Sequence, residues 1–244
     1  MRLQFLGDSR DAFKWDLLHW ICTTSPFPRL VYVPLLTPDV EGANDGQIHH
    51  HRFACRDFIR PFLESLKEEP RSLRRISSLG TLTPQHTFQV SVFAPERRIG
   101  SGAARREYWL DFDASTFSNS VVFFDPDNGF ETKKNYTRGK LPVPEWIGHD
   151  ELKNVFARLP DSSVAVVYQH RPHRNWTDLF KDLAQNLSYL PVTGAALESG
   201  LAFVALAGDA TAGKKITMAM TEYAKEHPSV DFTGFPPAGP DAPV

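Results

Sequence analysis

The sequence is poor in cysteine and carries almost no net charge. Its 244 residues include only Cys22 and Cys55, with no C-x-x-C pair, which argues against a disulfide framework or zinc knuckle and favours a reducing cytoplasm. The formal net charge is −2, so any binding of nucleic acid needs a local basic patch. No apolar run approaches the roughly 18 residues of a membrane span, and no signal-peptide pattern is present. We therefore expect no membrane segment; the sequence leaves the oligomeric state open.

Apolar residues make up 41% of the chain, enough for a substantial core. Segments with strand patterns, such as 29–36 and 120–124, alternate with segments that have helical periodicity. This alternation is typical of βαβ units, so we expect an α/β fold with a doubly wound, mainly parallel, Rossmann-like sheet and helices on both faces. We assign residues 1–232 to a single domain and the Pro/Gly-rich residues 233–244 to a flexible tail.

The stretch GDSRDAFKWDLLHWICTTS predicts the first long helix, because its apolar residues recur at a period of 3.6. Asp8 is the expected N-cap, and Asp11 is a favourable anion in the first turn. Asp11 and Lys14 lie three residues apart, on one helix face near the N-terminus. Such a pair could hold the polar part of a nucleotide-like ligand, or it could be a solvated surface ion pair.

The stretch SVVFFDPDNGFETKK, residues 120–134, runs from an apolar strand directly into acidic residues. Asp125 is the first polar residue after the strand, and Asp127 adds a second carboxylate. In a doubly wound sheet, ligands bind beyond the carboxyl ends of the strands, so Asp125 is a candidate functional group. A plain turn is the other interpretation, because Pro-Asp and Asn-Gly are turn formers.

Another predicted strand, SSVAVVYQH, ends in His170 and is expected to lie beside the strand that carries Asp125. Basic residues follow both strand ends: Lys133, Lys134, Arg171 and Arg174. Arginine and lysine bind phosphates, so these residues predict a nucleic-acid-binding rim around a catalytic centre of Asp125, Asp127 and His170. Ordinary surface cations are the alternative.

Three stretches resemble the adenine-N6 methyltransferases of bacterial large-subunit ribosomal RNA and the related three-Cys-motif partner proteins. Residues 7–15 match a G-[N/D]-x-x-D-x-x-K-[H/W] helix start, 121–128 a D-P-P-[Y/F] loop, and 164–170 an apolar strand that ends in tyrosine followed by proline or histidine. The resemblance implies that Lys14 and Trp15 lie near S-adenosylmethionine. Together with Asp8 and Asp11 they form the expected cofactor-binding helix start. It also implies that the Asp125 carboxylate and the carbonyl of the following proline accept from a target amino group.

The chain departs from the family pattern at two places. It reads DPDN instead of DPPY, so Asp127 and Asn128 replace a proline and the aromatic residue that stacks on a flipped base. The stretch TPDVEGANDG stands where the family has a glycine-rich cofactor loop. We expect a divergent methyltransferase-like protein that acts on nucleic acid.

Two alternatives belong to other classes of function. The residues Pro126-Asp127 and Glu131-x-Lys133 have the form P-D…E-x-K, which suggests a nuclease whose carboxylates, including Asp125, bind Mg²⁺. The other alternative is a non-catalytic module that binds nucleic acid or protein on the same fold.

Overall fold

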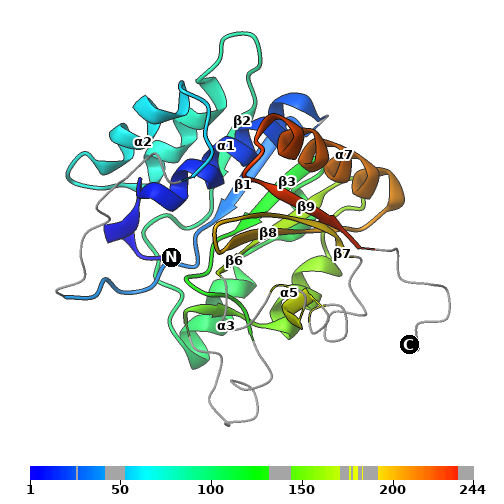
Figure 1. Ribbon diagram of the computed structural model, residues 1–244. Coiled ribbons are helices and arrows are strands. Elements are labelled where there is room, and N and C mark those ends of the chain that lie inside the picture. The colour runs from blue at the N-terminus through cyan, green and yellow to red at the C-terminus, as the bar shows by residue number, and fades with distance from the viewer. Residues whose placement is uncertain are drawn as a thin grey trace.

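The computed structural model describes residues 1–25, 27–41, 53–131, 144–170, 176, 178–180, 183 and 192–235. In this part of the chain, a seven-stranded sheet has the order β2-β1-β3-β6-β8-β7-β9 (Figure 1). Its strands are β1 (Arg29–Val33), β2 (Gln89–Val92), β3 (Ser120–Phe124), β6 (Val164–His170), β7 (Val192–Glu198), β8 (Leu201–Ala207) and β9 (Asp231–Gly234). A second, two-stranded sheet pairs β4 (Gly129–Phe130) with β5 (Trp146–Ile147).

Helices cover both faces of the large sheet, so the α/β fold is confirmed. The α-helices are α1 (Ser9–Thr24), α2 (Ile59–Lys67), α3 (Gly102–Leu110), α5 (His149–Phe156) and α7 (Ala210–Glu226). The 3-10 helices are η1 (Leu3–Phe5), η3 (Leu73–Thr81) and η4 (Ala114–Thr116). Among these described helices, none is both long and apolar enough to cross a membrane.

Alternate side chains of each central strand build two separate hydrophobic clusters. Tyr32 and Phe123 belong to the cluster beneath α1, α2 and α7, whereas Val31 and Val122 belong to the cluster above α3 and α5 (Figure 1). This period of two follows from the pleat of the strands. It explains why the central strands read as continuous apolar runs: both of their faces are buried.

The sheet is mixed: the pairing is parallel, as expected, in one half of the sheet and antiparallel in the other. β2, β1, β3 and β6 pair in parallel, but β8 is antiparallel to both β6 and β7, and β9 is antiparallel to β7. The reversal is a tight hairpin between β7 and β8, in which Ser199 and Gly200 have φ values of 44° and 93°. Two consecutive positive φ values suit the right-handed twist of a two-residue hairpin.

The sequence reading missed β7 and β9 for a physical reason. β7 reads VTGAALE and is short of the β-branched and aromatic residues that mark strands, and its place in the sheet depends on pairing with β8 and β9. β9 includes Thr233 and Gly234, which the sequence assigned to the tail. The remainder of that tail, 236–244, lies outside the described residues.

The chain reverses its direction of progress through the sheet between β1 and β3. β2 lies on one side of β1, and β3 and β6 continue on the other. Val33 and Phe124, the last residues of β1 and β3, are direct partners in the parallel register. The segments after them therefore leave the sheet side by side, at the position where open α/β sheets form a ligand crevice.

The packing of η3 on the edge strand β2 leads to a test of the fold. A Cβ atom added at Gly80 would lie 2.1 Å from the carbonyl oxygen of Phe88, so the backbone must shift to accept it. We expect Gly80→Ala to lower the free energy of unfolding in urea by about 1–3 kcal/mol. Gly234→Ala is the control, because the nearest atom to its added Cβ is 3.7 Å away. Equal losses in the two variants would contradict the described packing.

Candidate functional site

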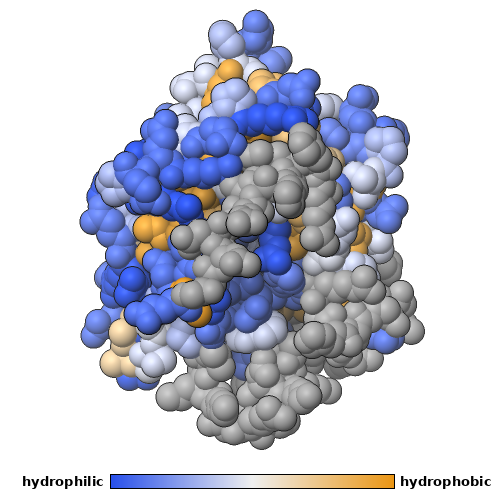
Figure 2. All heavy atoms as spheres, turned by 60° about the vertical axis from the view of Figure 1, so that its left-hand side comes forward, coloured by the Kyte–Doolittle hydropathy of each residue, from blue (hydrophilic) through white to orange (hydrophobic). Residues whose placement is uncertain are grey.

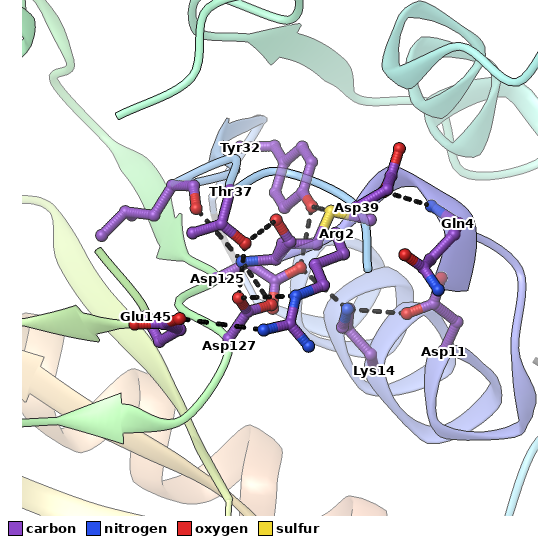
Figure 3. A network of polar contacts seen from close by, with 12 residues as sticks. Arg2, Gln4, Asp11, Lys14, Tyr32, Thr37, Asp39, Asp125, Asp127 and Glu145 are labelled. Atoms are coloured by element: carbon purple, nitrogen blue, oxygen red, sulfur yellow. Dashed lines mark hydrogen bonds and ion pairs between the residues drawn. The ribbon is translucent and has the colours of Figure 1, made fainter. Parts of the chain in front are cut away.

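Lys14 lies between two buried carboxylates at the carboxyl ends of β1 and β3. Its Nζ is 2.6 Å from Oδ1 of Asp11 and 2.8 Å from Oδ2 of Asp125 (Figure 3). The Tyr32 hydroxyl donates to the same Asp125 oxygen at 2.7 Å. Lys14 is 5% exposed, and both carboxylates are 2% exposed. The structure therefore brings Asp125 and the start of the first helix together.

The start of α1 fixes this arrangement locally. The Asp8 carboxylate accepts from the backbone amides of Arg10 and Asp11 and thereby caps the helix, as expected. Oδ2 of Asp11 accepts from the backbone amide of Gly7 at 2.8 Å. One oxygen of Asp11 thus holds the approach to the helix while the other holds Lys14.

The charges of the site reinforce one another. Burial alone lowers the pKa of the Lys14 ammonium, but the carboxylates of Asp11 and Asp125 outweigh burial and leave that pKa raised. Burial, aided by the nearby Asp125 carboxylate, raises the pKa of the Tyr32 phenol well above its usual range. Lys14 is therefore a permanent cation at neutral pH, and Tyr32 is a hydrogen-bond donor.

Asp127 has a different set of partners from Asp125. Its Oδ1 lies 3.0 Å from the α-ammonium of Met1, and its Oδ2 accepts from the Thr37 hydroxyl and lies 3.7 Å from Nε of Arg2 (Figure 3). Arg2 also reaches Glu145, with 3.8 Å between Nη2 and Oε1. The residues that leave β1 and β3 thus meet the first residues of the chain.

A cavity of about 50 Å³ opens beside these groups. This space suits a few water molecules and lies far below the roughly 300 Å³ at which ligand pockets begin. Its lining includes Asp8, Arg10, Lys14, Asp125, Pro126 and Tyr168.

When the left-hand side of the molecule in Figure 1 is brought forward, the described surface is mostly hydrophilic, with apolar residues in small patches (Figure 2).

The structure separates the sequence-predicted residues into three groups. Asp8, Asp11, Lys14, Asp125 and Asp127 all line the cavity. Trp15 and His170 are described but are not among the residues that line it. The expected phosphate-binding residues Lys133, Lys134, Arg171 and Arg174 lie outside the described residues.

Trp15 and His170, which do not line the cavity, contact residues close to it. Trp15 is fully buried, and its ring meets that of Tyr32 edge-on with centroids 5.1 Å apart, so it supports the floor of the site. His170 ends β6, and its backbone amide donates to the Asn128 carbonyl at 3.2 Å. That bond links the segment after β3 to the end of β6.

Sequence reasoning missed Met1, Tyr32 and Thr37 as parts of the site. Tyr32 carried a signal, because a tyrosine in a fully buried strand needs a partner for its hydroxyl. Thr37 and Met1 carried none, because their contacts join segments more than 30 residues apart. Tyr168 was recognised as the end of a strand, and it lies with its ring centroid 5.5 Å from Lys14 Nζ.

Comparison with known proteins assigns neither a family nor a function to the chain. No protein-family model matches the chain, and a search of curated proteins finds no significant match. The function is therefore argued from the chemistry of the site.

The donor set fits the methionine end of S-adenosylmethionine, which carries an ammonium, a carboxylate and a sulfonium. In this structure the Asp127 carboxylate and the Leu35 carbonyl accept from the α-ammonium of Met1. The Thr37 amide and hydroxyl donate to the carbonyl oxygen of Met1. Buried acidic oxygens also suit a sulfonium cation. The cavity of about 50 Å³ is too small to hold the adenosine part as well.

The aspartates that the nuclease interpretation assigns to Mg²⁺ bind groups of the protein. In the described ranges, no group of three or more histidine, cysteine, aspartate or glutamate side chains is placed to hold a metal ion. Asp125 accepts from Lys14 and Tyr32, and Asp127 accepts from Thr37. Glu131 follows β4, where its amide donates to the Ile147 carbonyl at 2.9 Å, and Lys133 lies beyond the described residues.

Removal of the Lys14 cation should leave two buried carboxylates without this ion-pair partner. We expect Lys14→Met to lower the free energy of unfolding by about 3–5 kcal/mol, measured in urea. Adding Asp125→Asn to this variant should recover about 1–3 kcal/mol, because one of the unpaired charges is gone. Lys67→Met is the matched control: its ion pair with Glu64 is at the surface, and its loss should cost less than about 1 kcal/mol. Equal costs for the two lysines would refute the buried ion pair.

Ionisation of Asp8 makes the stability of the protein depend on pH. Burial and the nearby Asp11 carboxylate raise the pKa of Asp8 from 3.8 to about 6, against the opposing effect of Lys14. Its favourable contribution to stability is complete below pH 3.8 and is lost as the pH rises through 6. Asp8→Asn keeps a capping oxygen but cannot ionise. This variant should match the wild type near pH 4 and, in urea unfolding above pH 7, exceed it by up to about 2 kcal/mol.

Asp113→Asn is the control of opposite sign. Asp113 also caps a helix, but hydrogen bonds from the Ser115 hydroxyl and amide lower its pKa. Its contribution is present at neutral pH and is lost as the pH falls, so its asparagine variant should be the less stable form at pH 7. If both substitutions shift stability in the same direction with pH, the assignment for Asp8 is wrong.

Proposed function

We propose that this chain is a methyltransferase-like protein that acts on nucleic acid and binds S-adenosylmethionine at the crevice between β1 and β3. The observation that carries the proposal is the Lys14–Asp125 pair, which joins the helix start to the D-P loop at this crevice. These are the two motifs of the resemblance, and they lie 111 residues apart in the chain. The parallel strands β2-β1-β3-β6, with their change of direction between β1 and β3, support a Rossmann-like crevice.

Each group at the crevice has a role in such a reaction. S-adenosylmethionine would supply an activated methyl group. The Asp125 carboxylate and the Pro126 carbonyl accept from a target amino group, as the resemblance implies. Lys14 and Tyr32 both bind Oδ2 of Asp125, so they hold the carboxylate in one orientation. Asp127 offers a carboxylate to a cationic ligand.

The connection between β4 and β6 supports nucleic acid as the substrate. The Phe130 amide donates to the Gln169 side chain at 2.9 Å, and the Gln169 amide group donates to the Asn128 carbonyl at 3.0 Å. Glu131 and His170 directly follow these residues, and the sequence after each of them is rich in lysine or arginine. The sequence of both stretches is basic, and an enzyme that acts on a polyanion needs lysine and arginine residues to bind its phosphates.

Calorimetry with S-adenosylmethionine tests the cofactor assignment. We expect binding by the wild type and at least about tenfold weaker binding by Asp127→Asn, because a charge-assisted bond is worth about 1.5 kcal/mol or more. Glu96→Gln is the control: it removes the same formal charge from an exposed pair with Arg74. Unchanged affinity in Asp127→Asn would place the cofactor elsewhere, and no binding by either the wild type or the control would refute the proposal.

Transfer of a labelled methyl group to RNA or single-stranded DNA then tests the reaction. Asp125→Asn should reduce this transfer at least about a hundredfold and leave cofactor affinity within about threefold, because the carboxylate is assigned to the target amino group. A proportional loss of both would make Asp125 a cofactor ligand instead.

A further inference from the structure

A second and larger hollow lies between α3 and α5, away from the crevice. The two helices lie side by side on one face of the sheet and contribute to the same hydrophobic cluster (Figure 1). The hollow has a volume of about 700 Å³, within the range of about 300–1,000 Å³ that is typical of small-molecule pockets. None of the residues that line it also lines the cavity beside Lys14.

A buried ion pair forms one wall of this pocket and joins the two helices. Both oxygens of Glu151 accept from the Arg105 guanidinium, with 2.7 Å between Oε2 and Nη2. The same carboxylate accepts from the Trp109 indole at 2.7 Å and from the Gly148 amide at 2.8 Å. Arg105 is 3% exposed. The pair therefore fixes α3 against α5, and the two charges of this wall cancel.

The indole ring of Trp109 gives the pocket a flat apolar surface. Its only polar atom, Nε1, is already bound to Glu151, so the rest of the ring can offer only apolar contact. The ring of Phe112 meets it edge-on with centroids 6.0 Å apart, which helps to hold it in place. Leu110, 78% exposed, and Val155 add aliphatic surface to the lining. A fixed and partly exposed aromatic ring suits a planar ligand that packs against it.

The other charges of the pocket are positive. Arg106 and Arg158 line it, both are exposed, and neither forms an ion pair with a described residue. Nε of Arg158 donates to the Asn154 carbonyl at 3.2 Å, which anchors this side chain at the pocket. Three arginines against one glutamate leave the lining with an excess of two positive charges. Guanidinium groups bind carboxylates through their planar fork and also stack on aromatic rings.

We propose that this pocket binds a small aromatic carboxylate, whose ring packs against Trp109 and whose carboxylate pairs with Arg106 and Arg158. A neutral apolar ligand would leave both guanidinium groups without a partner, and an aliphatic acid would lack the planar face that matches the indole. The pocket shares no lining residue with the crevice, so this inference does not depend on the proposed function.

Titration with 2-naphthoate tests the assignment, and the indole N–H resonances of ¹⁵N-labelled tryptophan report the location of binding. The chain has five tryptophans. We expect a saturable shift of the Trp109 resonance, because the ligand packs against this ring. Trp15, fully buried in the other hydrophobic cluster, should not shift.

The neutral amide 2-naphthamide has the same rings and serves as the matched ligand. We expect it to bind at least about fivefold more weakly than 2-naphthoate, because it cannot form the ion pairs. Added salt should reduce this difference, because it screens exposed charges.

Substitution of the two exposed arginines supplies the second measurement. Arg106→Gln and Arg158→Gln should each weaken the binding of 2-naphthoate about threefold or more, and the double variant about tenfold or more. Binding of 2-naphthamide should stay the same. Arg74→Gln is the control: it removes the same charge from a side chain that is 68% exposed and pairs with Glu96, so it should leave the affinity unchanged.

The possible results decide for or against the pocket. A shift of the Trp109 resonance, together with weaker binding by the two pocket variants but not by Arg74→Gln, would support the proposal. No binding of 2-naphthoate at millimolar concentration, equal affinity for 2-naphthamide, or unchanged affinity in the double variant would overturn it. Decanoate tests the need for an aromatic ring: if this aliphatic acid bound as tightly as 2-naphthoate, the aromatic assignment would be wrong.

Discussion

The buried ion pair between Lys14 and Asp125 is the interaction on which the site depends. An ammonium removed from water is stable only if carboxylates of good geometry surround it, and Asp11 and Asp125 do so from two different elements. Asp11 lies on α1, and Asp125 directly follows β3. If the helix moved away from the sheet, Lys14 or one of these carboxylates would lose its partner or become exposed to water. The Tyr32 hydroxyl locks the same carboxylate from β1. Three segments are thereby fixed at one point of the crevice.

The charges at this point balance one another. Four carboxylate residues line the cavity: Asp8, Asp11, Asp125 and Asp127. The cations that line it are Arg2, Arg10, Lys14 and the Met1 α-ammonium. The cavity therefore presents groups of both signs within a small space, and the buried carboxylates are stabilised by cations close to them.

The departures from the DPPY pattern have physical explanations in this fold. Asp127 replaces a proline and holds the Met1 ammonium and the Thr37 hydroxyl. Asn128 replaces a stacking aromatic, and its backbone bonds to the amide of His170 and the carbonyl of Glu145, so it connects β6 with the small sheet. Asn128 thus organises the backbone at this position.

The sequence by itself determined the local elements and the first polar residue after each central strand. The cap of α1 at Asp8 and the apolar runs of β1, β3 and β6 are set by neighbours along the chain. Only the tertiary structure decided the antiparallel half of the sheet, since the Ala- and Gly-rich β7 becomes a strand by pairing with β8. It also decided that Met1, Tyr32 and Thr37 belong to the site. Their contacts cross about 30 residues or more, and no local pattern encodes a bond between groups that only folding brings together.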